Sequence, residues 1–194
     1  GVGTNFFGSQ GSWDGAFWIP GCSHPALGDW NGDGALDLFV GGSNGTLRVF
    51  QNAGSPAVPN LVERSDGFAA LSALWAGVTN PAPALGDWTG DGKADLAIGG
   101  DGGKVVLLAS GGDFDDPQGP PFTNFLALAT SRGIPTFADM DGDSYADLLV
   151  LLADGAVDLY LNTQNLLEPF TTNAVQRGIL GMAVPTATGI AAMD

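Results

Sequence analysis

Hydrophobic and polar positions follow one another in the same order three times along the chain. Each repeat runs through a short apolar stretch, a nine-residue polar loop, a second apolar run, a turn containing glycine and an alternating segment. Short apolar runs between turn signals are typical of buried β-strands. We therefore predict strands directly after the polar loops, at residues 36–40, 96–98 and 148–152.

The alternating segments complete a hairpin in every repeat. Their apolar side chains recur at every second position and so share one face of a sheet; they are Leu47 and Val49, Val105 and Leu107, and Val157, Leu159 and Leu161. The turns before them are Ser43-Asn44-Gly45, Asp101-Gly102-Gly103 and Asp154-Gly155. Because type I′ turns need positive φ angles, Asn-Gly and Asp-Gly between apolar runs predict tight β-hairpins.

Two further strands are expected in each repeat. An apolar stretch lies directly before each polar loop, at Ala26-Leu27, Ala84-Leu85 and Thr136-Phe137. An outer, fourth strand is expected in the connectors 53–78 and 110–132, which contain Phe68 and Leu71, and Phe122, Phe125 and Leu126. Residues 111–121 are expected to form an exposed loop. Four antiparallel strands in a unit of about 55 residues are typical of a propeller blade.

The repeat therefore predicts an all-β fold, a β-propeller of four-stranded antiparallel blades, with about three and a half blades in this chain. The expected division is the outer part of a preceding blade at 1–24, blades at 25–82, 83–134 and 135–188, and the start of the next blade at 189–194. Because a partial ring does not close, we expect further blades from the same parent chain or from a partner chain. The chain begins with Gly1 instead of methionine, which favours a processed chain or a fragment.

The polar loops carry oxygen side chains at loop positions 1, 3, 5 and 9. They run from Asp29 to Asp37, from Asp87 to Asp95 and from Asp139 to Asp147. Together with the backbone carbonyl of position 7, these oxygens can surround a six- to eight-coordinate Ca²⁺. The carbonyls of position 7 belong to Ala35, Lys93 and Tyr145. An EF-hand is rejected because its glutamate at position 12 is replaced, by Val40, Ile98 and Val150.

The charge of the chain supports the same interpretation. The formal net charge is -15, with 21 acidic residues against six Lys and Arg, and the loops hold three, three and four of the acidic residues. Without metal these carboxylates repel one another at short range, and bound cations would offset them. Nucleic acid and anionic membrane surfaces are disfavoured as partners, because both require a basic surface. No apolar run is long enough to insert into a membrane.

The repeated motif resembles a known family. Pro-x-x-x-Asp-x-(Asn/Asp)-Gly-Asp-Gly-x-x-Asp-Leu, followed by a hairpin and a strand ending in Asn52 or Asn162, is similar to the FG-GAP/VCBS repeat. That repeat forms the blades of the integrin α-subunit propeller and of related seven-bladed lectins of fungi and bacteria. The resemblance covers residues 25–52, 83–110 and 135–162.

The resemblance implies the ligands of three Ca²⁺ sites. They are Asp29, Asn31, Asp33 and Asp37; Asp87, Thr89, Asp91 and Asp95; and Asp139, Asp141, Asp143 and Asp147. Such sites are expected to brace the turn between two inner strands. Thr89 replaces a carboxylate or amide by a hydroxyl, so the second loop should bind least tightly. Ser144 replaces a glycine, so the third loop should carry backbone strain.

Several residues outside the ligand set have two interpretations. Trp30, Trp88 and Met140 share loop position 2 and favour a packing slot between blades over ligand stacking. Trp13, Trp18 and Trp75 lie outside the repeat register and are the better candidates for a sugar platform. Cys22, the only cysteine, is expected to be a small buried residue. Asn44-Gly45-Thr46 is either a glycosylation acceptor or simply a turn.

A catalytic function is not expected. His24 is the only histidine and favours a structural role, and no Gly-x-Ser-x-Gly motif is present. The carboxylates that could form a glycosidase pair are already committed to the cation loops. We expect a calcium-binding module for recognition or adhesion, with a glycan or protein ligand, that is extracellular or lies at the cell surface or in the secretory lumen. The alternatives are a structural subunit whose open blade edges are completed by partner chains, and the accessory propeller of a larger enzyme.

Overall fold

The computed structural model describes residues 23–69, 71–115, 118–127, 132–165, 168–171 and 176–177, with 118–127 and 176–177 described by their backbone. Within these residues the fold is antiparallel β-structure with one five-residue helix, α1 (Ser65–Ala69). No helix in this part of the chain is long and apolar enough to cross a membrane. The predictions for Trp13, Trp18, Cys22 and the partial repeat at 189–194 lie outside the described residues.

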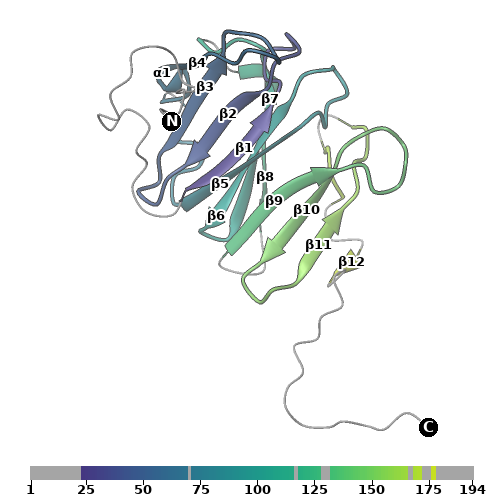
Figure 1. Cartoon of the computed structure of the whole chain (residues 1–194). Coiled ribbons are helices and arrows are strands. Elements are labelled where there is room, and N and C mark those ends of the chain that lie inside the picture. Colours follow the sequence, from purple (N-terminus) through teal and green to yellow (C-terminus); the bar gives the residue numbers. More distant parts are fainter. Residues whose placement is uncertain are drawn as a thin grey trace, which may run out of the picture.

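The described strands form three consecutive units of four (Figure 1). Blade 1 consists of β1 (His24–Gly28), β2 (Asp37–Gly41), β3 (Leu47–Asn52) and β4 (Leu61–Glu63). Blade 2 consists of β5 (Thr79–Gly86), β6 (Asp95–Asp101), β7 (Lys104–Ser110) and β8 (Gln118–Ala127). Blade 3 consists of β9 (Arg132–Ala138), β10 (Asp147–Leu152), β11 (Val157–Tyr160) and β12 (Gln176–Arg177).

All neighbouring strands in a blade pair antiparallel and in chain order, which confirms the predicted four-stranded antiparallel units. Blade 1 forms a sheet of its own, whereas blades 2 and 3 share one eight-stranded sheet. The link is the pairing of β6 with β9, through Gly100 with Gly133 and Asp101 with Arg132. The described blades follow one another in a row, from β1–β4 at the upper left of Figure 1 to β9–β12 at the lower right.

The hairpin turns are present as predicted, but their type differs. Gly45 N donates to Gly42 O at 3.0 Å, Gly42 N donates to Thr46 O at 2.9 Å, and Gly45 has φ +83° while Asn44 keeps a negative φ. Gly155 and Leu152 repeat this arrangement in blade 3. The prediction of type I′ turns is therefore wrong at these two hairpins. A type I turn followed by one left-handed glycine needs positive φ at a single residue, and the glycine supplies it.

The connector between blades 1 and 2 also departs from the prediction. The outer strand β4 is formed by Leu61–Glu63, whereas Phe68 lies in α1 and Leu71 in the turn after it. Both side chains are buried because they pack into the core between blades 1 and 2. The exposed loop predicted at 111–121 is wrong in part, since Phe114 is buried in the same core and β8 begins at Gln118.

Two apolar clusters fill the spaces between successive blades. The first lies between blades 1 and 2 and contains Trp30, Phe39, Val49, Phe68, Trp75, Leu96, Ile98 and Val106, among others. The second lies between blades 2 and 3 and contains Trp88, Ala97, Val105, Leu107, Leu148, Val150 and Tyr160, among others. Each sheet is therefore apolar on a face that packs against its neighbour, as expected for stacked blades.

The inner strands β1, β5 and β9 approach one another closely. A Cβ atom on Gly28 would lie 2.6 Å from Leu85 Cβ, and one on Gly86 would lie 2.6 Å from Phe137 Cβ. Glycine at these two positions is required by the space available, because a larger side chain would push the strands apart. The same glycine-to-side-chain contact thus sets the spacing of both pairs of blades.

Loop position 2 is a packing slot between blades at Trp30 and Trp88, as predicted, but Met140 does not fill such a slot among the described residues. Trp30 is 0% exposed in the first cluster and Trp88 is 1% exposed in the second, whereas Met140 is 47% exposed. Trp30 contacts Phe39 and Phe68 with ring centroids 5.5 Å and 5.3 Å apart. In the described part of the chain, blades 1 and 2 are each followed by a blade that covers this residue, and blade 3 is not.

This difference predicts unequal costs for the same kind of truncation. Trp30→Ala should lower the free energy of unfolding by about 3–5 kcal/mol, because it opens a cavity between two blades. Met140→Ala, at the same loop position, should change it by less than about 0.5 kcal/mol. Urea denaturation followed by circular dichroism measures both values. Equal losses for the two variants would contradict the assignment of the slot.

Candidate metal centre

The three polar loops occupy the same place in their blades. Loop 1 (residues 29–37) joins β1 to β2, loop 2 (87–95) joins β5 to β6, and loop 3 (139–147) joins β9 to β10. Each loop is closed by one strand pair, namely Gly28 with Asp37, Gly86 with Asp95 and Ala138 with Asp147. Every loop is therefore enclosed by the paired residues at the loop end of the inner two strands of its blade.

The first aspartate of each loop gathers the backbone amides of the residues that follow it. Asp29 Oδ1 accepts hydrogen bonds from Gly32 N at 2.8 Å and Asp33 N at 3.0 Å, and Asp29 Oδ2 accepts one from Gly34 N at 2.8 Å. Asp87 accepts three equivalent bonds and Asp139 two. The loop is thus wound around the carboxylate of position 1, which brings the later oxygen ligands near it.

This winding requires left-handed backbone at loop position 6. Gly34 and Gly92 adopt φ +86° and +85° there, and Ser144 is held at φ +75° in loop 3. This conformation destabilises a residue with a Cβ atom by about 1–2 kcal/mol. The predicted backbone strain at Ser144 is confirmed.

The aspartate of position 9 is buried in every blade. Asp37, Asp95 and Asp147 are all 0% exposed. In loop 1, Asp37 Oδ2 accepts a hydrogen bond from Trp30 N at 2.9 Å and Oδ1 accepts one from Asn52 N at 2.8 Å. The other two blades repeat both bonds, with Trp88 and Ser110 on Asp95 and with Met140 and Asn162 on Asp147.

Sequence reasoning identified position 9 as a ligand but missed this second role, which fastens the loop to the end of the third strand of its own blade. The only trace of this role in the sequence is a constant spacing, because the bonded residue follows the aspartate by the same interval in every repeat, as Asn52, Ser110 and Asn162. Backbone amides have no sequence signature of their own, so the pairing became visible only in the structure.

A nearby positive charge would stabilise these buried carboxylates in their ionised form. Burial raises the pKa of Asp37 to about 6, and the nearby carboxylates of Asp33 and Asp29 also raise it. The hydrogen bonds from the backbone amides of Asn52 and Trp30 lower this pKa, but by less. Burial likewise raises the pKa of Asp95 to about 6, with Asp91 adding to the rise. A cation in the loop would favour the ionised form that the amides already bind.

Loop 3 has the most complete set of carboxylates. Oxygen atoms of Asp139, Asp141 and Asp147 all lie within 4.8 Å of one another. One cation with oxygen ligands at about 2.3–2.6 Å spans such a cluster. The pKa of Asp141 is raised by loss of hydration and by the neighbouring carboxylates. Asp143 accepts hydrogen bonds from Gln164 Nε2 at 2.8 Å and Tyr145 N at 2.9 Å.

The predicted ligands of loops 1 and 2 lie in the same order but differ in chemistry. In loop 1 the amide of Asn31 takes position 3 and donates to Asp33 Oδ2 at 2.9 Å. In loop 2 the Thr89 hydroxyl oxygen is buried near Asp95, yet meets no partner at hydrogen-bonding geometry among the described residues. Lys93 Nζ lies 3.5 Å from Asp91 Oδ2 and brings a positive charge into loop 2.

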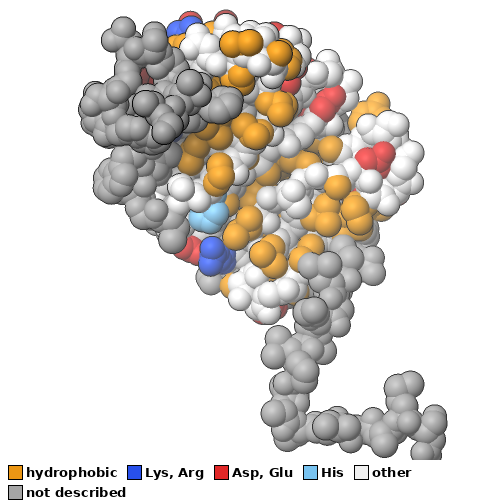
Figure 2. Space-filling model, viewed as in Figure 1, with side chains coloured by type: hydrophobic (Ala, Val, Ile, Leu, Met, Phe, Trp, Pro, Cys, Tyr) orange, Lys and Arg blue, Asp and Glu red, His pale blue; other side chains and the backbone are white. Residues whose placement is uncertain are grey.

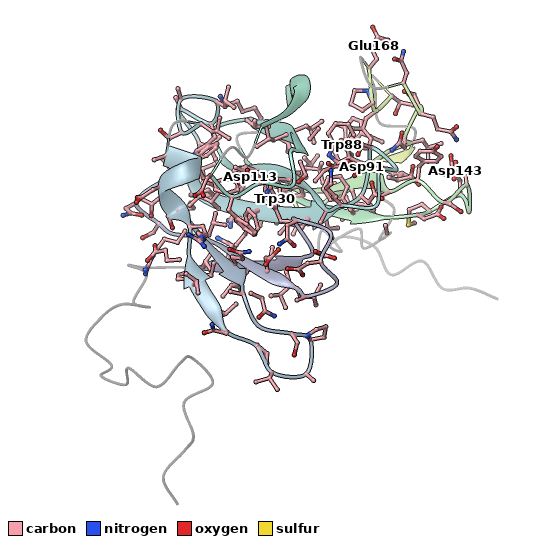
Figure 3. All side chains as sticks on the ribbon, turned by 90° about the horizontal axis from the view of Figure 1, so that it is seen from above. Trp30, Trp88, Asp91, Asp113, Asp143 and Glu168 are labelled. Carbon is pink, nitrogen blue, oxygen red and sulfur yellow. The ribbon has the colours of Figure 1, made fainter. Side chains whose placement is uncertain are left out.

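Hard oxygen donors, a buried hydroxyl oxygen without a partner and carboxylates of raised pKa together fit a divalent cation such as Ca²⁺. Loop 2 has the poorest donor set of the three, since a hydroxyl replaces an amide or carboxylate and a lysine competes with the metal. Trp30 and Trp88 are buried, whereas Asp143 lies at the outer edge of the molecule in the view from above (Figure 3).

The remaining candidate residues fall outside these loops. His24 is half-buried at the start of β1, and its Nδ1 has no hydrogen-bond partner among the described residues. Asn44 and Thr46 are exposed on the β2–β3 turn, where Thr46 Oγ1 donates to Asn44 Oδ1 at 2.6 Å. Glycosylation there stays a prediction. On the face shown in Figure 2, Lys and Arg side chains are few and separate, so no basic surface gathers there.

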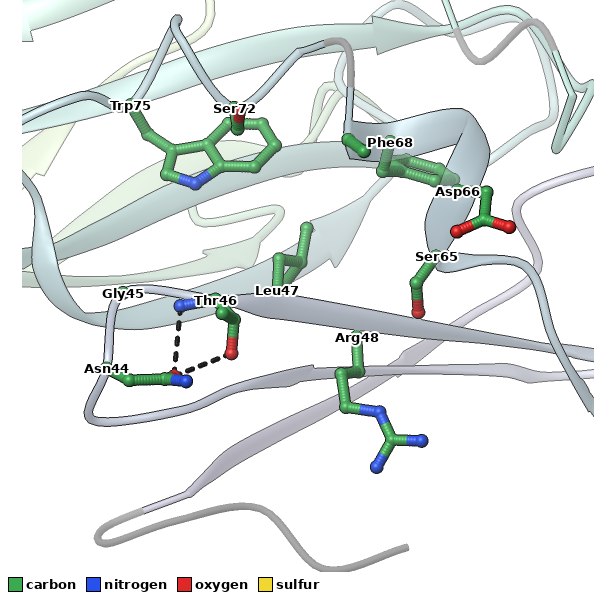
Figure 4. A pocket seen from close by; sticks show the side chains of 11 residues that line it. Asn44, Gly45, Thr46, Leu47, Arg48, Ser65, Asp66, Phe68, Ser72 and Trp75 are labelled. Atoms are coloured by element: carbon green, nitrogen blue, oxygen red, sulfur yellow. Dashed lines mark hydrogen bonds between the residues drawn. The ribbon is translucent and has the colours of Figure 1, made fainter. Parts of the chain in front are cut away.

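A pocket of about 480 Å³ lies between the β2–β3 turn, β3 and the segment from α1 to Trp75 (Figure 4). Its lining includes Thr46, Leu47, Phe68 and Trp75. Trp75 is 5% exposed and belongs to the first apolar cluster, so its role is to fill the core between blades 1 and 2. This pocket was not predicted, because the connector 53–78 was expected to contribute an outer strand and not a helix.

The raised pKa values predict how the metal-free protein responds to pH. In the unfolded chain Asp37 and Asp95 titrate near 3.8, and in the folded chain near 6. The folded state therefore binds more protons between these values, and the contribution of the two groups to the free energy of unfolding falls as pH rises through this window.

Urea denaturation in the presence of a chelator, between pH 4 and pH 7, measures the effect, with Asp95→Asn as the reference that cannot ionise. The wild-type protein should lose more stability across the window than Asp95→Asn. A smaller loss in the wild type would contradict the raised pKa.

Comparison with known proteins agrees with this geometry. A family model described as an FG-GAP-like repeat matches residues 29–98 and 87–150, each match beginning at the first aspartate of a loop. No curated protein matches the chain. The two matches together span more than half of the chain and contain all three polar loops. The all-β blades, the loops at their inner hairpins and this match place the chain in the family of FG-GAP-like repeat proteins.

Proposed function

We propose that this chain is a calcium-binding propeller module that recognises a glycan or protein ligand outside the cytosol. The observation that carries the proposal is the recurrence of one oxygen-rich loop at the same hairpin of three blades, with three carboxylates of loop 3 within 4.8 Å. FG-GAP repeats are associated with recognition and adhesion, which supports the wider role.

The residues that would hold Ca²⁺ are those at loop positions 1, 3, 5, 7 and 9. In loop 3 the closest set is Asp139, Asp141 and Asp147, with the carbonyl of Tyr145 and the carboxylate of Asp143 as further donors. Bound Ca²⁺ supplies positive charge that offsets the mutual repulsion of the carboxylates. Asp147 would then serve both the metal and the amides of Met140 and Asn162.

Support for a bracing role comes from the position of the loops. Each loop joins the inner two strands of its blade, and its last aspartate is bonded to the end of the third strand. Fixing the loop therefore fixes three strands relative to one another. A surface made of such loops and hairpins is rigid when the metal is bound, and rigid surfaces bind ligands at a lower entropic cost.

Two further considerations support recognition outside the cytosol. Oxygen-ligand sites of moderate affinity fill at extracellular calcium concentrations, which are far higher than cytosolic ones. Most of the described carboxylates lie in the metal loops or accept backbone hydrogen bonds or ion pairs, and no hydrogen bond or ion pair joins a described carboxylate to His24. A non-enzymatic role is therefore part of the proposal.

Calcium should stabilise the folded chain. When the free calcium concentration is 100 times the dissociation constant of a site, binding at that site adds about 2.7 kcal/mol to the free energy of unfolding. Thermal melts and calorimetric titration with Ca²⁺, Mg²⁺ and chelator measure the gain. Asp141→Ala should remove the share of the calcium-dependent gain that belongs to loop 3, whereas Asp66→Ala, an exposed aspartate on α1, should leave it unchanged.

Thr89→Asp offers the opposite change and should increase the affinity of loop 2 for Ca²⁺, since a carboxylate replaces the hydroxyl at position 3. Melting curves that are the same in calcium and in chelator would remove the metal from the proposal.

Recognition should depend on the metal as well. The full chain should bind a ligand on a glycan array, or a protein captured from an extracellular extract and then identified, when calcium is present. It should lose most of this binding when a chelator is added. Asp141→Ala should weaken binding if the ligand contacts the loop side of blade 3. A chain that binds calcium but retains no glycan or protein ligand would overturn the recognition role while leaving the metal sites intact.

A further inference from the structure

We infer that Ca²⁺ binding in neighbouring loops is positively coupled, through hydrogen bonds that join each loop to the next blade. The inference rests on the proposed calcium function and concerns the regulation of the same sites. It assigns a coupling role to Ser110 and Asn162, which are not metal ligands.

Ser110, at the end of β7, connects loop 1 to loop 2. Its hydroxyl donates to the carbonyl oxygen of Trp30, at position 2 of loop 1, over 2.9 Å. Its backbone amide donates to Oδ1 of Asp95, at position 9 of loop 2, over 2.8 Å. Ser110 is 3% exposed, so these bonds are shielded from water. One residue thus contacts the metal loops of two blades.

Asn162 makes the same connection between loops 2 and 3. Its side-chain Nδ2 donates to the carbonyl oxygen of Trp88 at 2.8 Å and to that of Ala146, within loop 3, at 3.1 Å. Its backbone amide donates to Asp147 Oδ1 at 2.8 Å. Two chemically different side chains therefore make the same bond at equivalent positions, which argues against a chance contact.

The loops also touch one another directly. Ala94 N, at position 8 of loop 2, donates to the carbonyl oxygen of Asp29 at 2.8 Å. A Cβ on Gly32 would lie 3.5 Å from Lys93 Cγ, and one on Gly90 would lie 2.7 Å from Tyr145 Cε1. Position 7 of each following loop therefore packs over position 4 of the loop before it.

These contacts give the coupling a physical basis. A loop without metal must be ordered against the repulsion of its own carboxylates, and binding pays that cost. Metal in loop 1 fixes the carbonyls of Asp29 and Trp30, which in turn hold Ala94 and Ser110. Loop 2 is then partly ordered before its own metal arrives, so its apparent affinity rises.

Repulsion between neighbouring cations opposes this effect but is small. Loop 1 carries three aspartates, loop 2 carries three aspartates and Lys93, and loop 3 carries four aspartates, so the net negative charge of each loop offsets at least one divalent ion. The coupling should therefore be positive. A coupling of about fivefold in affinity lies at the lower end of the usual range for linked sites.

Calcium titration of the full chain followed by NMR separates the loops, because each has glycine amides of its own. Gly32 and Gly34 report loop 1, Gly90 and Gly92 report loop 2, and Gly142 reports loop 3. Asp33→Ala should empty loop 1 and lower the affinity of loop 2 about fivefold or more.

The matched variants test whether Ser110 carries the effect. In the Ser110→Ala background, Asp33→Ala should change the affinity of loop 2 by a smaller factor than in the wild type, because the bond from Ala94 N to the carbonyl oxygen of Asp29 still joins the two loops. Ser110→Asn introduces the residue that blades 1 and 3 hold at this position, and it should retain the coupling. If Ser110→Ala fails to fold, the wild-type and Ser110→Asn backgrounds still compare loop 2 with and without metal in loop 1.

The outcomes are distinct. If the wild-type protein binds metal in every loop and Asp33→Ala empties loop 1 without changing the affinity of loop 2, the coupling is overturned and the proposed function stays in place. Coupling of undiminished size in Ser110→Ala overturns the role of Ser110. Absence of calcium binding in all loops overturns the proposed function itself.

Discussion

The structure depends on a buried carboxylate that is held from two sides. In each blade the aspartate at the end of the polar loop accepts one amide from the start of its loop and another from the end of the third strand. Burying a charge is costly unless it is paired and hydrogen-bonded. The amides satisfy part of that requirement, and the oxygen-rich loop beside the carboxylate is suited to supply the rest through a cation.

The same bond explains why the blades repeat so closely. It fixes the loop, the inner hairpin and the third strand as one unit, whose apolar face must then be covered by the next unit. The tryptophan of loop position 2 serves both needs, since its amide binds the buried aspartate and its ring enters the next interface. Packing between blades and the chemistry of the loops are thus set by adjacent atoms of one residue.

Much of this arrangement follows from the sequence. The apolar periodicity predicted the inner three strands of each blade, and the spacing of oxygen side chains located the three loops and most of the candidate ligands. The position of Phe68 in a helix and the turn type at Gly45 could not be predicted, because packing against blade 2 and one residue's φ angle decide them. The bonds of Ser110 and Asn162 also depend on the neighbouring blade. For the same reason, the pairing of Asp143 with Gln164 had no signal in the spacing of the motif.

One difference between the two interfaces has a mechanical consequence. Blades 2 and 3 share a sheet through β6 and β9, and the side chains of Arg132 and Asp101 reinforce the joint at 3.6 Å. Blade 1 is a separate sheet, held to blade 2 by side-chain packing and a few bonds between loops. A pulling force along the row would therefore meet least resistance at the first interface, so that blade 1 detaches while the other two still act as a single elastic body.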